Sequence, residues 1–158
     1  TPVSVETIMS QYKLPSVSPL EAHLGFWMRF ISNQASGNLD KLLKPHDISV
    51  SEWVVMRTLY QRDGVSHAEL QFTLGMTKGA TSKIVSRLEA RVLIERRISQ
   101  RSGRDQLLTL TADGNQLLPI LAAIADKNDD LFFGHLPKKQ RAELRQVLQA
   151  LGLQHQIT

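Results

Sequence analysis

The sequence contains no cysteine. This excludes disulfide bonds, zinc or iron–sulfur centres held by thiolates, and any thiol-based redox switch. No apolar run approaches the roughly 20 residues that a membrane-spanning helix needs. Residues 1–15 also lack the basic flank and apolar stretch of a signal peptide. We therefore expect a cytoplasmic protein without a transmembrane segment.

Motifs of catalytic sites are also missing. We find no G-x-S-x-G elbow, no P-loop and no dinucleotide-binding glycine motif, and the five histidines form no H-x-x-x-H pair. Asp126, Asp129 and Asp130 lie close together in sequence but lack the glycine and the distal glutamate of a calcium loop. A solvated helix face explains them better. We expect no enzyme activity, no metal site and no cofactor.

The positive charge of the chain is concentrated in one segment. The 158 residues carry a net charge of +4, but residues 66–104 alone hold eight Lys or Arg and three Glu, a net +5. The rest of the chain therefore sums to −1. A basic block in a nearly neutral protein indicates a surface for a polyanion. On charge alone, an ordinary solvated face is an equally good interpretation.

The N-terminal part predicts an arm followed by a long helix. Residues 1–17 show no clear period, and we interpret them as the arm. Apolar residues then recur at three- and four-residue steps. We expect this helix to begin at Pro19, with Ser18 and Glu21 as a capping box, and to end near Pro45.

The middle of the chain has the pattern of a helix-turn-helix followed by a β-hairpin. Three short helices are predicted by the capping residues at their starts, Ser49, Ser66 and Thr77. Gly75 provides the turn between the last two helices. Residues 93–98 and 106–110 then predict two strands joined by a long basic loop. After the hairpin, Thr111 caps a long helix that Pro119 should kink, and a last helix starts near Pro137.

This order predicts a mainly α-helical protein with a small β-hairpin wing, a winged helix-turn-helix. In such a fold the second helix of the motif enters the major groove, and the hairpin reaches the adjacent backbone or minor groove. Hydroxyl, lysine and arginine side chains suit phosphates and base edges, and Gly79 permits close approach of DNA. Taken one at a time, each of these side chains could equally be an ordinary solvated residue. We predict DNA contacts from Thr77, Lys78, Gly79, Thr81, Ser82, Lys83, Ser86 and Arg87 on the helix, and from Arg97, Arg101, Ser102, Gly103 and Arg104 in the wing.

Four segments together resemble the MarR family of bacterial winged-helix transcription regulators. They are residues 48–53 (ISVSEW), 74–78 (LGMTK), 88–96 (LEARVLIER) and 110–114 (LTADG). The resemblance covers about residues 20–151 and implies a homodimer on a pseudo-palindromic site in double-stranded DNA. Residues 18–48 and 111–158 would form the dimerisation region, and residues 49–110 the DNA-binding lobe. By the same resemblance, Ser66 and His67 would lie near phosphates.

Two positions depart from the family pattern. Val92 stands where the family often has a glycine that ends the recognition helix in a left-handed conformation, so we expect this helix to end differently. Ser102 stands where the family wing has an aspartate that holds its arginine. Unless Asp105 replaces that aspartate, we expect a more mobile wing and a weaker DNA contact.

The resemblance also implies control by a small ligand, often an aromatic or phenolic acid, between the dimerisation helices and the DNA-binding lobe. Residues on the helices that would line this space are His23, Trp27, Phe30, Trp53 and Met56. Aromatic residues at helical spacing more often fill a core, and His23 suits an interface better than a ligand contact. We expect a ligand-responsive repressor or activator. A constitutive or architectural DNA binder and a winged-helix dimer for protein interaction are the alternatives.

Overall fold

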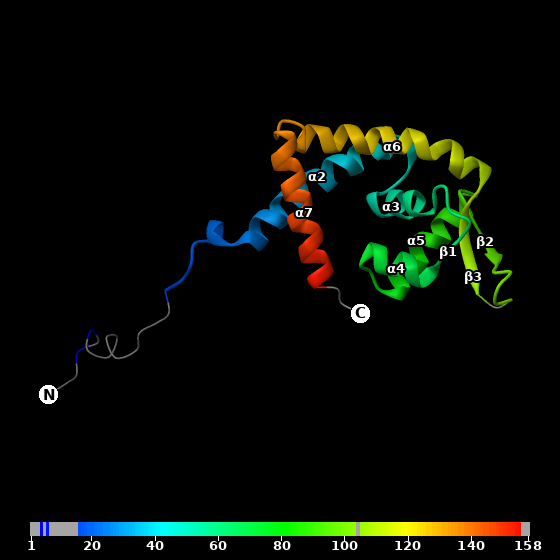
Figure 1. The fold of residues 1–158 in the computed structure, drawn as a ribbon, viewed down its shortest axis with the longest axis horizontal. Coiled ribbons are helices and arrows are strands. Elements are labelled where there is room, and N and C mark those ends of the chain that lie inside the picture. Colours follow the sequence, from blue (N-terminus) through cyan, green and yellow to red (C-terminus); the bar gives the residue numbers. More distant parts are fainter. Residues whose placement is uncertain (1–3, 5, 7–15, 104, 156–158) are drawn as a thin grey trace. The chain divides into compact units, whose positions relative to one another are not determined.

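The computed structural model describes residues 4, 6, 16–103 and 105–155. The chain divides into two compact units, residues 1–33 and 34–158. The described part of the first unit contains a 3-10 helix, η1 (Leu20–Ala22), and the beginning of α2 (Leu24–Leu43), which continues into the second unit. The larger unit is mainly helical and carries a small antiparallel sheet, as the sequence predicted (Figure 1).

The larger unit follows the predicted order of elements. After α2 come η2 (Lys44–His46), α3 (Val50–Leu59), β1 (Val65–Ser66), α4 (His67–Leu74), α5 (Lys78–Ala90), β2 (Ile94–Ile98), β3 (Gln106–Leu110), α6 (Ala112–Phe133) and α7 (Lys138–Gln154). Pro119 does not divide α6, which continues as one helix on both sides of it. No helix in the described ranges is long and apolar enough to cross a membrane.

The predicted start of the first long helix is wrong. Residues Leu20–Ala22 form only a 3-10 turn because His23 is extended, with φ −91° and ψ 122°. The α-helix begins at Leu24. The position before η1 is Pro19, which provides no side-chain cap. Instead, the indole N–H of Trp27 donates to the carbonyl of Glu21 at 2.8 Å, so a side chain satisfies a backbone group at the break.

The predicted caps of the larger unit are confirmed. Ser49 and Glu52 form a reciprocal capping box at the start of α3, with both bonds at 3.1 Å. Hydroxyl groups likewise accept the backbone N–H three residues on at the starts of α4, α5 and α6, from Ser66, Thr77 and Thr111. Gly75 ends α4 with φ 62°. Each helix therefore begins where a local hydrogen bond replaces a missing backbone partner.

The hairpin is part of a three-stranded sheet. Strands β2 and β3 pair antiparallel, with Ile94 opposite Leu110 and Ile98 opposite Gln106. Strand β1 adds to the other edge of β3, with Val65 opposite Leu108. The sequence did not predict β1, because two residues are too few to show the alternation of a strand.

The hydrophobic core lies between the helices and the sheet of the larger unit. Its fully buried side chains come from α2, α3, α4, α5, β1 and α6, and include Leu43, Val55, Met56, Leu59, Val65, Leu70, Val85, Leu88 and Leu121. Helix α7 is different, since it has no buried residue. Its apolar stripe of Leu144, Val147, Leu148 and Leu151 is exposed.

Helix α5 ends at Ala90, and Val92 follows its C-cap, Arg91. The geometry of Val92 overturns the expected departure from the family. Val92 takes the left-handed conformation, with φ 57°. Its N–H donates to Glu89 at 2.9 Å, and the N–H of Leu93 donates to Leu88 at 3.0 Å. These two bonds form a Schellman motif, with the buried pair Leu88 and Leu93 as its hydrophobic contact. The helix therefore ends as it would with glycine, and a β-branched residue bears the strain.

Replacing Val92 with glycine is expected to stabilise the protein. A left-handed conformation costs an L-residue about 1–2 kcal/mol, and the exposed Val92 side chain contributes little packing. The greater freedom of glycine in the unfolded chain offsets roughly 0.4–1 kcal/mol of this. We expect a net gain of about 0.5–1 kcal/mol in urea unfolding. Val92→Ala is the control, because alanine removes the exposed methyl groups but keeps the strain. Equal stability of the two variants would contradict this explanation.

The start of α6 is bonded to the end of α5. Thr111 donates its N–H to Leu93 O at 3.1 Å and its hydroxyl to Val92 O at 2.7 Å. A Cβ at Gly114 would lie 2.2 Å from Leu93 O. Only glycine therefore allows the first turn of α6 to approach this backbone so closely.

Candidate nucleic-acid interface

The second helix of the motif, α5, presents its first turns to solvent. Exposed side chains on α5 and at its cap are Thr77, Lys78, Lys83, Ser86 and Arg87. Gly79 is also exposed, and nothing lies within 4 Å of the position that its Cβ would occupy. This part of the helix offers charged and hydroxyl groups, with open space for another molecule to approach the backbone.

Thr81 is a correction to the predicted set. It is fully buried, and its hydroxyl donates to the carbonyl of Thr77 at 2.9 Å. Thr81 therefore stabilises the first turn of α5 and does not lie on the outer face. Ser82 is half-buried, and its hydroxyl lies 3.1 Å from Nε2 of His67. This hydrogen bond connects the first turns of α4 and α5, so His67 and Ser82 set the position of the two helices.

The wing loop is organised by its own hydrogen bonds. Ser99 donates its N–H to Asp105 O at 2.7 Å, and Gly103 donates to Ser99 O at 2.9 Å. The hydroxyl of Ser102 accepts from the N–H of Asp105 at 3.0 Å. Ser102, which stands where the family has an aspartate, thus closes the loop by accepting a hydrogen bond from the backbone of Asp105. Arg97, Arg101, Ser102 and Gly103 are exposed, and Arg104 lies outside the described residues.

The basic residues of this region fall into two groups. Arg91 and Arg96 are engaged within the chain. Arg91 donates to the carbonyls of His46 and Asp47, and Arg96 pairs with Glu89 at 2.8 Å. The hydrogen bond to Glu89 raises the pKa of Arg96 above its usual value. The side chains of the second group have no acidic partner within the described part of the chain: Lys78, Lys83, Arg97 and Arg101.

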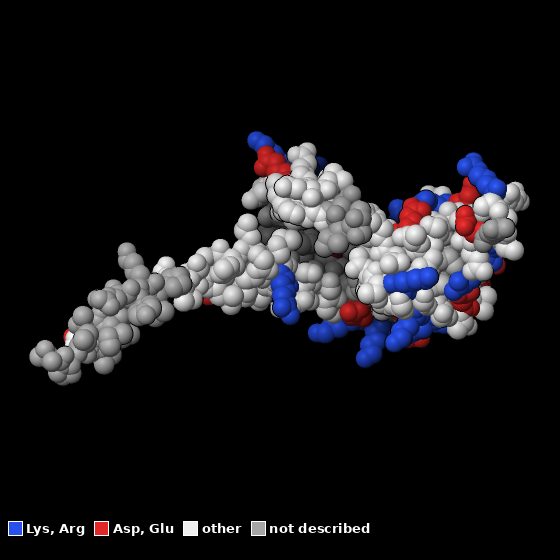
Figure 2. Space-filling view, turned by 90° about the horizontal axis from the view of Figure 1, so that it is seen from below, with Lys and Arg blue, Asp and Glu red and all other residues white. Residues whose placement is uncertain are grey.

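Figure 2 shows the face seen from below Figure 1. Lys and Arg side chains gather there over the region that contains the helix-turn-helix and the sheet, with fewer acidic side chains between them. Of the basic residues in 66–104, Lys78, Lys83, Arg87, Arg97 and Arg101 are exposed on the larger unit. Such a surface attracts a polyanion.

Arg87 has an acidic neighbour that the sequence did not predict. Glu52 is 1% exposed, and its Oε1 lies 3.8 Å from a guanidinium nitrogen of Arg87, a side chain that is 65% exposed. Among the described residues, Oε2 of Glu52 has no hydrogen-bond partner. Nothing in the sequence indicates that position 52 faces position 87. The buried carboxylate of Glu52 therefore attracts the guanidinium group of Arg87 and holds it close to α3.

The predicted ligand-contact residues fall in both units. His23, Trp27 and Phe30 belong to the first unit and are exposed, and the rings of Trp27 and Phe30 lie 6.1 Å apart. Met56 is fully buried in the core of the second unit, so its assignment to a pocket wall is wrong. Trp53 is half-buried and lines a cavity. A pocket formed by all of the predicted residues stays a prediction.

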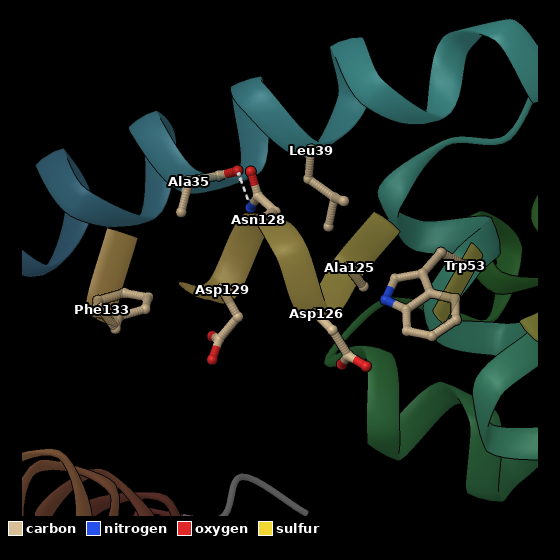
Figure 3. Close-up of a pocket in the computed structure, with 8 residues that line it drawn as sticks. All are labelled: Ala35, Leu39, Trp53, Ala125, Asp126, Asn128, Asp129 and Phe133. Atoms are coloured by element: carbon tan, nitrogen blue, oxygen red, sulfur yellow. Dashed lines mark hydrogen bonds between the residues drawn. The ribbon is translucent and has the colours of Figure 1, made fainter. Parts of the chain in front are cut away.

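The cavity at Trp53 has a volume of about 310 Å³ (Figure 3). Helices α2, α3 and α6 provide its lining residues, which are Ala35, Leu39, Trp53, Ala125, Asp126, Asn128, Asp129 and Phe133. Asn128 is buried, and both ends of its amide are bonded, since it donates to Ala35 O at 3.0 Å and accepts from Asn38 at 2.7 Å. It therefore connects α6 to α2. No group of three or more His, Asp or Glu within the described ranges could hold a metal ion.

Comparison with known proteins identifies this architecture. Residues 48–105, from the end of η2 to the wing loop, match the model of the MarR family. The HTH-type transcriptional repressor Rv2887 of Mycobacterium tuberculosis is 29% identical over 132 residues, which cover 84% of this chain and 95% of the repressor. The chain therefore contains a MarR-family domain over residues 48–105. Relatives of this chain are named transcriptional repressors or regulators.

Solved structures of MarR-type proteins share the fold. CouR from Rhodococcus jostii RHA1, bound to p-coumaroyl-CoA, matches with a TM-score of 0.82 and 22% identity, covering 90% of this chain and all of CouR. The MepR–DNA complex of S. aureus matches with a TM-score of 0.73 and 22% identity, covering 82% of this chain and 96% of MepR. These likenesses confirm the winged-helix architecture predicted from the sequence.

Proposed function

We propose that this MarR-family chain binds double-stranded DNA as a homodimer at a pseudo-palindromic operator, and that a small ligand modulates this binding. The observation that carries the proposal is the division of the basic residues. Arg91 and Arg96 hold the lobe together, whereas Lys78, Lys83, Arg97 and Arg101 have no acidic partner in the described chain. Side chains left free in this way are available for phosphates and base edges.

Helix α5 enters the major groove in this proposal, and the wing contacts the neighbouring backbone. Lys78 and Gly79 bring the N-terminus of α5 close to a phosphate, where free amide groups favour an anion. Arg87 is placed to read a guanine with two hydrogen bonds. The proposed contacts are Ser66, His67, Thr77, Lys78, Gly79, Ser82, Lys83, Ser86 and Arg87, with Arg97, Arg101, Ser102, Gly103 and Arg104 in the wing.

We propose homodimerisation because the apolar stripe of α7 is exposed. A helix of 17 residues with an apolar stripe and no buried residue needs another surface to cover that stripe. Residues 18–48 and 111–158 form the dimerisation region in this proposal, and residues 49–110 the DNA-binding lobe. Two lobes related by a two-fold axis contact half-sites about 34 Å apart, one turn of DNA.

Ligand control follows from the cavity beside α3. CouR is bound to p-coumaroyl-CoA in its structure, so this fold accommodates a small organic ligand. A ligand that favours a different spacing of the two α5 helices weakens DNA binding by its differential affinity for the two states. Such coupling is typically about 1–3 kcal/mol.

The test is selection of bound duplexes from random and genomic DNA at one fixed salt concentration, because phosphate contacts make affinity depend steeply on salt. We expect enrichment of an inverted repeat with half-sites about one turn apart. Weak binding without sequence preference would replace the proposal with an architectural role. Absence of any duplex binding by protein freed of bound small molecules would favour a protein-interaction dimer.

A further inference from the structure

The cavity beside Trp53 combines an aromatic wall with carboxylates. Trp53 and Phe133 provide rings, and Ala35, Leu39 and Ala125 provide apolar surface. The charged lining residues are Asp126 and Asp129, and no Lys, Arg or His belongs to the lining. We propose that this cavity accepts an organic cation, an amine on an aromatic or apolar body. The inference rests on the proposed function, since it names the ligand class of the proposed regulator.

The two carboxylates project on the same side of α6 (Figure 3). Asp129 is partly neutralised, because Arg141 of α7 lies 3.2 Å from its Oδ2. Asp126 has no cationic partner in the described part of the chain. A bound ammonium group can therefore pair with Asp126, whose carboxylate is exposed. A carboxylate ligand would instead meet two like charges, which disfavours it.

The indole of Trp53 adds two interactions suited to an amine. Its ring lies at one end of the cavity, with the nitrogen edge turned toward Ala125 and Asp126 (Figure 3). An aromatic face attracts a cation placed within about 6 Å of its centre. Within the described residues, the indole N–H has no hydrogen-bond acceptor, in contrast to that of Trp27, which donates to Glu21. A hydroxyl or carbonyl oxygen on the ligand can accept this bond.

Asn128 does not compete for the ligand. Both ends of its amide are used in bonds to α2, to Ala35 and Asn38. Asn128 therefore forms part of the cavity wall. Asp126 and the indole N–H of Trp53 are the polar groups that remain to determine which ligand binds. Their chemistry differs from what the aromatic acids implied by the family resemblance would need.

The experiment uses three probes that share one ring: phenethylamine, 2-phenylethanol and phenylacetate. Trp27→Phe makes Trp53 the sole tryptophan, because the chain has only these two. Its fluorescence then reports on the cavity. We expect phenethylamine to bind at least about tenfold more tightly than phenylacetate, with the alcohol between them. Asp126→Asn should reduce this ratio to near unity. Asp130→Asn, one turn on along α6 but outside the lining, should leave the ratio unchanged.

Two results would overturn the inference. One is equal or tighter binding of phenylacetate. The other is absence of phenethylamine binding at millimolar concentration in a protein that still binds its duplex. Duplex binding is measured separately on the same preparations, so loss of the ligand inference is distinguishable from loss of the proposed DNA-binding function. An amine preference that persists in Asp126→Asn would likewise exclude Asp126 as its cause.

Discussion

Simultaneous replacement of Lys83 and Arg87 with alanine is expected to weaken duplex binding at least about tenfold at physiological salt. Both side chains are exposed on α5, and neither carries buried apolar area of the core. Loss of a base-reading arginine costs about 1–3 kcal/mol, and loss of a phosphate contact lowers the salt slope by about one. The slope of log affinity against log salt should therefore become shallower by one to two, measured by fluorescence anisotropy with a labelled duplex.

The matched control removes the same charge elsewhere. Lys138 and Lys139 lie at the exposed start of α7, so replacing both with alanine lowers the net charge equally. This control should keep the slope within experimental error. An equal loss in both double variants would mean that overall charge, and not the face of α5, determines binding.

Placing glutamate at Val147 and Leu151 is expected to convert a dimer to a monomer. Both lie on the exposed apolar stripe of α7, and two buried charges without partners are incompatible with an interface. Because two linked half-sites raise affinity by roughly 10²–10⁴ over one, affinity for an inverted repeat should fall at least about a hundredfold. Sedimentation equilibrium measures the mass, and circular dichroism tests that the fold is kept.

Glutamates on the opposite side of α7 provide the control. Ala142 and Gln146 are exposed and lie away from the apolar stripe. The double variant Ala142→Glu and Gln146→Glu adds the same charge, and we expect it to remain dimeric and to bind DNA. Dimerisation of the Val147 and Leu151 variant would show that another surface holds the two chains together.

Local signals in the sequence were sufficient to predict the winged lobe. Ser49, Ser66, Thr77 and Thr111 begin their helices in the structure because a hydroxyl cap depends on groups only three residues away. The hairpin was predictable for a similar reason, since two short strand-forming runs flank a polar loop that contains glycine. Residue type also placed Lys78, Lys83 and Arg87 on the exposed part of α5.

Features that depend on distant contacts were not predictable. Thr81 and Ser82 have similar hydroxyls, and only packing makes one buried and the other a partner of His67. The left-handed conformation of Val92 was not predicted because a Schellman motif with a buried hydrophobic contact outweighs the preference of one residue. The cavity beside Trp53 requires helices about 90 positions apart to meet, as Asn38 and Asn128 do.

The hydrogen bonds from Thr111 to Val92 and Leu93 make the connection between α5 and α6 stiff. Gly114 packs directly against the backbone of Leu93, so the two helices cannot move closer together. Helix α6 then acts as a lever arm, with α5 fixed to its N-terminal end. From Ala125 at the cavity to Ala112 at the joint, the arm is roughly 20 Å long at 1.5 Å per residue. A tilt of about 10° at the cavity moves the joint by about 3 Å. In the dimer that we propose, a movement of this size at the cavity beside Trp53 would change the spacing of the two α5 helices relative to one turn of DNA.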